Sequence, residues 1–224
     1  MAGRRQIAVL GLGRFGQSLA RELTRIGHDV LAIDADERQV QAVADDVTHA
    51  VQIDFTDEDA LGELGVGKFD TAIVAVSSDI EASILATVVL QRLGVRNILA
   101  KAATELHGSI LERLGVSRVV HPEAETGERV AHSFAAPSVR DYLDVAPGYG
   151  LARVAVTEPL AGKSLAELDL PATFDVTPLA LHRAGTVTLN PGASEVLRES
   201  DELIVAGRDE DLERLPARVV ASRS

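Results

Sequence analysis

The 224-residue chain has no cysteine and no tryptophan, and its other aromatic residues are scarce. The absence of cysteine excludes disulfides and metal sites built on thiolates. Aromatic residues form only 3% of the chain, which argues against the stacking platforms that bind single-stranded nucleic acid. No apolar run approaches the roughly 18 residues that a membrane-spanning helix needs. Several function classes are therefore excluded before any motif is considered.

The chain also lacks a surplus of basic residues. It has 22 Lys and Arg against 34 Asp and Glu, for a net charge of −12. A general nucleic-acid binder carries the opposite balance, so we expect no nucleic acid partner. Two arginines and a short apolar run at the start resemble a signal peptide only superficially, because glycines interrupt the run and no cleavage site follows. We interpret this start as the first strand of a cytosolic protein.

Apolar residues form 46% of the chain, and residues 6–122 arrange them in a regular alternation of short strands and amphipathic helices. The pattern predicts strands at 6–12, 29–34, 48–54, 70–77, 97–102 and 117–122. It predicts the intervening helices at 14–26, 37–44, 57–65, 79–94 and 105–115, with Asp79 as a helix N-cap. Strands alternating with helices indicate βαβ units. The fold class is therefore α/β, with a Rossmann-like doubly wound parallel sheet.

The pattern changes after residue 122. One more helix is predicted at 123–135, and Pro137 disfavours its continuation. Short strands follow at 140–146, 151–158, 176–185, 186–192 and 201–208, with helices at 164–170 and 209–215. This order predicts a small, mainly antiparallel α+β domain. We expect a nucleotide-binding domain over residues 1–137 and a second domain over 138–224.

Residues 11–16 read "GLGRFG" and form the G-x-G-x-x-G fingerprint between the first predicted strand and helix. Gly11 permits the tight turn, Gly13 lets the backbone approach a phosphate, and Gly16 lets the helix pack on the strand. Free N–H groups and the helix dipole would then hold the phosphates. The alternative is that these glycines serve packing alone.

Four residues at predicted strand ends are candidates for the same site. Asp34 would accept hydrogen bonds from ribose hydroxyls and disfavours the 2′-phosphate of NADP. Asp36 either shares this role or caps the next helix. Asp54 accepts from an adenine amino group or forms a turn. Lys101 reaches a phosphate or extends its stem toward solvent.

Arg14 is unusual in a loop whose backbone already holds a pyrophosphate. Its guanidinium could pair with a terminal phosphate, as in ADP or ATP, or with a neighbouring subunit. The alternative is an exposed arginine in the first turn of a helix.

The sequence offers no catalytic set beside this loop. A dehydrogenase needs a proton donor or acceptor next to the nicotinamide. None of the six histidines lies in a motif with an acid or a nucleophile, and His121 of "HPE" is the nearest candidate, with a structural role as its alternative. We therefore expect a regulatory nucleotide and no enzyme. A small NAD-dependent oxidoreductase is the alternative, and a redox-sensing transcription factor ranks below it because no basic recognition helix is present.

Several stretches together resemble a known family: "AVLGLGRFGQSLARELTRIGHDVLAID", "THAVQIDFTDEDAL", "AIVAVSSDIEASILATVVLQRLG", "AKAATELHGSILERLGVSRVVHPE" and "SDELIVAGRDEDLERL". The chain resembles the KtrA/TrkA-type cytosolic regulatory subunits of bacterial potassium uptake systems. In these proteins an RCK (regulator of potassium conductance) domain precedes a TrkA-C domain, and the resemblance covers essentially the whole chain. It implies homodimers that assemble into an octameric ring. The ring would dock on the cytoplasmic face of a membrane potassium-translocating subunit of the KtrB/TrkH type.

The resemblance also implies ligands and their residues. ATP or ADP, with NAD or NADH as the alternative, would bind the first domain and change the shape of the ring. Asp34 and Asp36 would meet the ribose, Asp54 the adenine and Lys101 the phosphates. Glu123 would help hold Mg²⁺ or another cation between two nucleotide sites, or else act as an acid at a helix start. The phosphates would meet Gly11, Gly13, Arg14, Phe15 and Gly16, with Arg14 at the terminal phosphate of ATP.

Two features depart from the family pattern. Phe55 stands where relatives often have a small residue, and its ring could stack on or narrow the adenine pocket. Some relatives bind cyclic di-AMP in the second domain at the dimer interface. The stretch "LHRAGTVTLNPG" matches that pocket loosely through His182, Arg183, Asn190 and Pro191.

Overall fold

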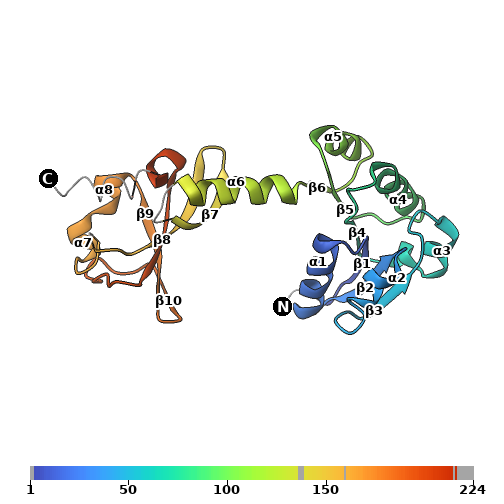
Figure 1. The fold of residues 1–224 in the computed structure, drawn as a ribbon, viewed down its shortest axis with the longest axis horizontal. Coiled ribbons are helices and arrows are strands. Elements are labelled where there is room, and N and C mark those ends of the chain that lie inside the picture. Colours follow the sequence, from blue (N-terminus) through green and yellow to red (C-terminus); the bar gives the residue numbers. More distant parts are fainter. Residues whose placement is uncertain (1–2, 136–138, 159, 214, 216–224) are drawn as a thin grey trace. The chain divides into compact units, whose positions relative to one another are not determined.

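The computed structural model describes residues 3–135, 139–158, 160–213 and 215, and its two compact units are treated separately below (Figure 1). The division falls after Pro122, so helix α6 (Pro122–Ala135) groups with the C-terminal unit. The expected boundary at residues 137 and 138 lies outside the described residues. Within the C-terminal unit, the His132 ring of α6 stacks on Tyr142 at a centroid distance of 4.2 Å, and its Nδ1 lies 3.0 Å from Glu213 Oε1. These contacts explain why the helix groups with the second unit.

The N-terminal unit is a six-stranded parallel sheet with strand order β3-β2-β1-β4-β5-β6. Its strands are β1 (Gln6–Leu10), β2 (Asp29–Asp34), β3 (His49–Gln52), β4 (Thr71–Val74), β5 (Ile98–Lys101) and β6 (Arg118–Val120). Its helices are α1 (Arg14–Arg25), α2 (Glu37–Gln41), α3 (Glu58–Glu63), α4 (Ile80–Arg92) and α5 (Glu105–Arg113), with a 3₁₀ turn at Val66–Lys68. The predicted doubly wound α/β fold is confirmed, although α2 and most strands are shorter than predicted.

Alternate residues of the strands pack on opposite faces of this sheet, as the pleat requires. Ile7 and Val9 of β1 join a cluster that includes Ala20 of α1 and Val40 of α2. Ala8 and Leu10 join the cluster on the other face, to which α3, α4 and α5 contribute. Both faces are thus covered, which is why the strands read as nearly continuous apolar runs.

Side-chain caps start most of these helices. The Asp79 carboxylate accepts the Ala82 N–H at 2.9 Å, which confirms the predicted cap of α4. Asp36, Asp57 and Thr104 cap α2, α3 and α5 in the same way. Helix α1 is different, because its N-cap is Gly13 and no side chain accepts its first N–H groups. The uncapped helix is the one that follows the glycine-rich loop.

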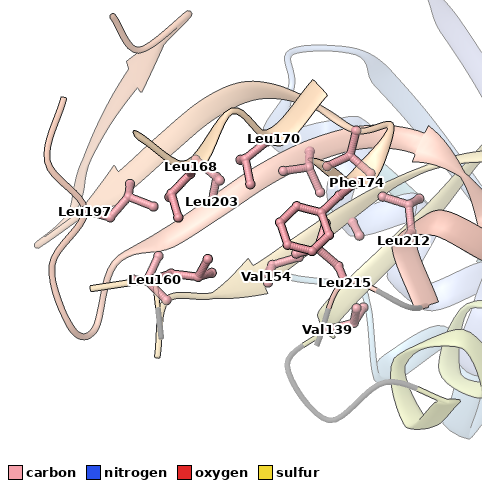
Figure 2. Close-up of a cluster of buried hydrophobic side chains, with 14 of the residues drawn as sticks. Val139, Val154, Leu160, Leu168, Leu170, Phe174, Leu197, Leu203, Leu212 and Leu215 are labelled. Carbon is pink, nitrogen blue, oxygen red and sulfur yellow. The ribbon is translucent and has the colours of Figure 1, made fainter. Parts of the chain in front are cut away.

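The C-terminal unit is built on a five-stranded antiparallel sheet of order β10-β9-β11-β8-β7. The strands are β7 (Val139–Ala146), β8 (Tyr149–Ala155), β9 (Thr177–Arg183), β10 (Thr186–Leu189) and β11 (Glu202–Arg208). Short helices α7 (Leu165–Leu168) and α8 (Leu170–Phe174) cover the sheet, and residues 209–213 form a closing helical turn. Leucines and valines from these elements meet in one apolar core (Figure 2). The predicted α+β second domain is confirmed.

The single helix predicted at 164–170 is wrong in detail. Asp169 adopts a left-handed conformation with φ of 38°, which ends α7. Pro171 then lies in the first turn of α8, where its missing N–H costs nothing. The sequence reading assigned no element to α8.

Candidate nucleotide site

The GLGRFG loop lies at the carboxyl end of β1, where the strand order reverses between β1 and β4. In open α/β sheets this switch point is where ligands bind. A Cβ on Gly11, whose φ is +91°, would lie 2.3 Å from a Val76 methyl, and a Cβ on Gly16 would lie 1.9 Å from the Gly11 carbonyl oxygen. A Cβ on Gly13 would meet nothing within 4 Å. Two glycines therefore serve packing, and the third faces open space.

The first turn of α1 offers unused hydrogen-bond donors. Gly13 is the N-cap, with φ of −64°, and the first turn contains no acidic side chain. The first intrahelical bond is the one that Gln17 N–H donates to the Gly13 carbonyl at 2.9 Å. The N–H groups of Arg14, Phe15 and Gly16 therefore point out of the helix without an intrahelical acceptor. Together with the helix dipole they form an anion-binding end.

Asp34 connects this loop to the end of β2. Its Oδ2 accepts the Leu12 N–H at 2.6 Å, and its Oδ1 accepts the Asp36 N–H at 2.8 Å. Each carboxylate oxygen retains a further lone pair for a ribose hydroxyl. The predicted ribose acceptor thus lies directly beside the GLGRFG loop.

Two other acidic candidates have local partners in the structure. Asp36 accepts from the Arg38 N–H at 2.9 Å and from its guanidinium at 2.8 Å, and these bonds lower the pKa of the Asp36 carboxyl. This geometry is that of the helix cap that the sequence offered as an alternative. Asp54 accepts from the hydroxyl and N–H of Thr56 at 2.7 and 2.9 Å, which lowers its pKa and forms a turn. Ribose and adenine contacts by these two residues stay predictions.

Lys101 and Phe15 meet beneath the start of α1. The Lys101 Nζ lies 5.7 Å from the centre of the Phe15 ring, within the range of a cation–π contact. Lys101 is only 8% exposed, although it is the last residue of β5, at the carboxyl end of the sheet. The structure thus brings a buried ammonium close to the uncapped helix end. Its charge adds to the positive potential that an anion would meet there.

Arg14 is the exposed first residue of α1. Within the described part of the chain its guanidinium makes no hydrogen bond or ion pair, whereas Arg21 pairs with Asp46 and Arg25 pairs with Glu22. Arg14 also lines an open hollow along α1 together with Gln17 and Arg21. The side chain is available to an external anion.

Two further predicted residues lie elsewhere. Phe55 is 8% exposed and packs in the apolar cluster that contains Leu61, so most of its ring is in the core. Glu123 lies in the first turn of α6, within the C-terminal unit. Among the described residues, no three His, Asp or Glu side chains converge in a way that could hold a metal ion. Base contact by Phe55 and cation binding by Glu123 stay predictions.

The structure shows a polar contact of the loop that the sequence reading missed. The Gln17 amide nitrogen donates to the Leu12 carbonyl at 2.9 Å and to Gln39 Oε1 at 2.7 Å. Residues 17 and 39 belong to different helices, and no local pattern pairs them. Tertiary packing alone brings them together.

His107 is the buried histidine of the N-terminal unit. His107 is 1% exposed and accepts the Ala103 N–H through Nδ1 at 3.2 Å, while its Nε2 has no hydrogen-bond partner. Burial, together with the nearby His121, lowers the pKa of His107. A buried neutral imidazole is the form that this environment favours.

In the C-terminal unit, two of the four residues that loosely match a cyclic di-AMP pocket, His182 and Arg183, already have side-chain partners. The Arg183 guanidinium donates to both carboxylate oxygens of Asp201, at 2.9 and 2.7 Å, and to Glu195 at 2.7 Å. The His182 Nδ1 lies 3.1 Å from Glu202. Arg183 therefore connects β9, through hydrogen-bonded ion pairs, to the segment that precedes β11.

Comparison with known proteins assigns the chain to a family. The TrkA-N domain model matches residues 7–122, and the TrkA-C domain model matches residues 151–218. The chain belongs to the TrkA-N/TrkA-C family. The resemblance read from the sequence is therefore confirmed.

Two relatives within the TrkA-N/TrkA-C family match the chain over nearly its full length. Ktr system potassium uptake protein A of Bacillus subtilis (strain 168) is 39% identical over 210 residues, which are 94% of this chain and 95% of that protein. Ktr system potassium uptake protein C of the same strain is 38% identical over 220 residues, 98% of this chain and 100% of that protein.

Solved structures agree on the fold. The GsuK RCK domain superposes with a TM-score of 0.67 at 21% identity, over 97% of this chain and 48% of that one. The GsuK channel bound to NAD gives 0.63 at 20% identity, over 94% of this chain and 38% of that one. No described helix of this TrkA-N/TrkA-C chain has the length and apolar character needed to cross a membrane.

Proposed function

We propose that this protein is the nucleotide-binding regulatory subunit of a membrane potassium uptake system. The observation that carries the proposal is the uncapped N-terminus of α1, with Gly13 open to solvent, in a chain that matches potassium uptake proteins A and C along nearly all of its length. No sequence motif pairs one of the histidines with an acid or a nucleophile. The bound nucleotide would therefore act as an effector and not as a substrate.

An adenine nucleotide fits the groups around the loop. Its phosphates would accept from the N–H groups that open α1, and its ribose from Asp34. Arg14 would pair with the terminal phosphate, because its guanidinium is exposed and points from the same turn. ATP or ADP matches this arrangement better than NAD, whose bridging pyrophosphate has no terminal group for Arg14 to bind.

Regulation requires that the nucleotide bind one conformation of the assembly better than another. We propose that homodimers of the chain assemble into an octameric ring on the cytoplasmic face of a potassium-translocating membrane subunit. Exchange of ATP for ADP would change the ring through the additional phosphate. Neither the described residues of the site nor the two potassium uptake proteins compared above favour the alternative, an NAD-dependent oxidoreductase.

The test of nucleotide binding is isothermal titration of the full chain with ATP, ADP and NAD. Replacing Arg14 by Ala should weaken ATP binding roughly tenfold or more and ADP binding much less, because the charge-assisted bond that is lost is the one to the γ-phosphate, which ADP does not have. The matched control is Arg25→Ala, which removes an arginine of the same helix that pairs with Glu22. Equal losses for ATP and ADP would refute the role of Arg14.

The test of regulation is potassium uptake by cells that lack their own uptake systems. The chain would be expressed with the membrane subunit encoded by its source organism, and uptake measured with and without it. Gel filtration with ATP should show a mass near eight subunits. An unchanged uptake rate, together with a monomer on gel filtration, would contradict the proposal.

A further inference from the structure

The peptide groups of the GLGRFG loop are held by side chains from outside the loop. Leu12 lies at the centre of this arrangement and is completely buried. Its N–H is held by Asp34 at 2.6 Å, and its carbonyl is held by the Gln17 amide at 2.9 Å. Both polar groups of one residue are thus fixed by side chains of β2 and α1.

The geometry of the peptide bond links these contacts to the phosphate site. In a planar trans peptide the C=O and the following N–H point in opposite directions. Because the Leu12 carbonyl points to the Gln17 amide, the Gly13 N–H points away from that amide. Gly13 itself is exposed, and a Cβ built on it would meet no atom within 4 Å. The same holds for the Gly11–Leu12 peptide. Its Leu12 N–H points to Asp34, so its Gly11 carbonyl points the other way, toward Gly16.

The Gln17 amide is itself held in place by a second hydrogen bond. Its nitrogen also donates to Gln39 Oε1 of α2 at 2.7 Å, so both amide hydrogens have acceptors. Its oxygen faces Arg21 Nη1 at 3.5 Å. An amide with both hydrogens engaged cannot rotate freely, so it holds the Leu12 carbonyl in one orientation.

We propose that Gln17 is a positioning residue of the nucleotide site. It does not touch the ligand; it orients the Leu12–Gly13 peptide so that the Gly13 N–H, with the N–H groups of α1, is directed at a phosphate before the nucleotide binds. Gln39 supports it from α2. The inference rests on the proposed function, since it names the residue that prepares that same site.

The test compares Gln17→Met with Gln41→Met in the full chain. Both changes replace a helical glutamine by a side chain of similar length without a donor, and Gln41 is exposed on α2 with no side-chain hydrogen bond among the described residues. Affinities are measured by isothermal titration for ADP and by competition against ADP for adenosine, which lacks phosphate.

Gln17→Met should weaken ADP binding about tenfold, the effect of losing one well-aligned hydrogen bond to a charged group, and leave adenosine binding unchanged. Gln41→Met should leave both unchanged. A purely structural role would weaken both ligands together, so equal losses for ADP and adenosine would overturn the inference. ADP binding to Gln17→Met with the wild-type affinity would also overturn the inference.

Should Gln17→Met fail to fold by circular dichroism, Gln39→Met provides the second measurement. This variant removes only the hydrogen bond between Gln39 and the Gln17 amide. It should weaken ADP binding about threefold relative to Gln41→Met and leave adenosine binding unchanged. Equal ADP affinity in these two variants would also overturn the inference. If the wild-type chain binds no adenine nucleotide, the proposed function fails first, which distinguishes the two failures.

Discussion

Gly13 and Gly16 lie three residues apart in one loop, and replacing each by alanine should have opposite consequences. A methyl group on Gly16 would lie 1.9 Å from the Gly11 carbonyl oxygen, 3.0 Å from the Gly11 carbonyl carbon and 3.3 Å from the Ala75 methyl. The first of these contacts is with backbone, which cannot rotate away as a flexible side chain does. To reach even 3.0 Å, the loop and α1 would have to separate by about 1.1 Å.

Such overpacking typically costs about 1–3 kcal/mol, and a clash with backbone belongs at the upper end. We therefore expect Gly16→Ala to lower the free energy of unfolding of the N-terminal unit by about 3 kcal/mol. With a urea dependence of about 2 kcal/mol per molar, the unfolding midpoint should fall by about 1.5 M.

Gly13→Ala should leave stability almost unchanged. Its φ of −64° is accessible to alanine, and a methyl group there meets no protein atom within 4 Å. Alanine is a poorer N-cap than glycine, but it also restricts the unfolded chain, and these effects oppose each other to within about 0.5 kcal/mol. The same methyl group would occupy the space beside the Gly13 N–H, so ADP binding should fall at least tenfold.

The assay combines urea unfolding followed by far-ultraviolet circular dichroism with ADP titration at low urea. Gly16→Ala should shift the unfolding transition of the N-terminal unit, and Gly13→Ala should affect only ADP binding. Wild-type ADP affinity in Gly13→Ala would refute the assignment of the loop as a phosphate site. A large loss of stability in Gly13→Ala would refute the geometric argument itself.

Two further predictions concern charged groups. Arg183→Met leaves the carboxylate of Asp201, which is 2% exposed, without its main partner. It should therefore lower the urea midpoint of the C-terminal unit clearly more than the control Arg153→Met. Arg153 forms only exposed ion pairs, at 3.7 Å to Asp141 and 3.8 Å to Glu202. Intrinsic tyrosine fluorescence measures this, because the chain has no tryptophan and both tyrosines lie in that unit; the idea fails if the two variants shift equally. Because Arg183 lowers the pKa of Asp201 in the folded state, the gap between wild type and Arg183→Met should narrow as the pH falls below about 4. Burial lowers the pKa of His107 in the folded state. Below about pH 6.5 the unfolded chain therefore binds a proton that the folded chain does not. The free energy of unfolding of the N-terminal unit should be highest above that pH and decline below it. His107→Gln should reduce that decline when unfolding is followed by circular dichroism from pH 7.5 to 5.5, and an identical pH dependence would contradict it.

The order of elements in the N-terminal unit could be predicted because each signal is local. Apolar runs, helix caps such as Asp79 and the glycine spacing at 11–16 are properties of short segments, and a buried parallel sheet preserves them. The second domain was harder, since its short strands and Pro171 give weaker local signals. Helix α8 was missed because the left-handed Asp169 that separates it from α7 has no local signature strong enough to predict.

In the candidate nucleotide site, too, some features follow from local sequence and others only from tertiary packing. The sequence by itself determined that a glycine-rich turn, a helix that begins in it and an acid at the end of β2 occur together, because these follow from residue type and spacing. Only the tertiary structure decided how each side chain is used. It made Asp36 the cap of α2 and placed Asp54 in a turn with Thr56. It buried Phe55 in the core, paired Arg183 with Asp201, and left Arg14 exposed at the helix start. It also joined Gln17, Leu12 and Gln39 across two helices. Hydrogen bonds between distant segments depend on how the segments pack, and no pattern within either segment encodes that distance.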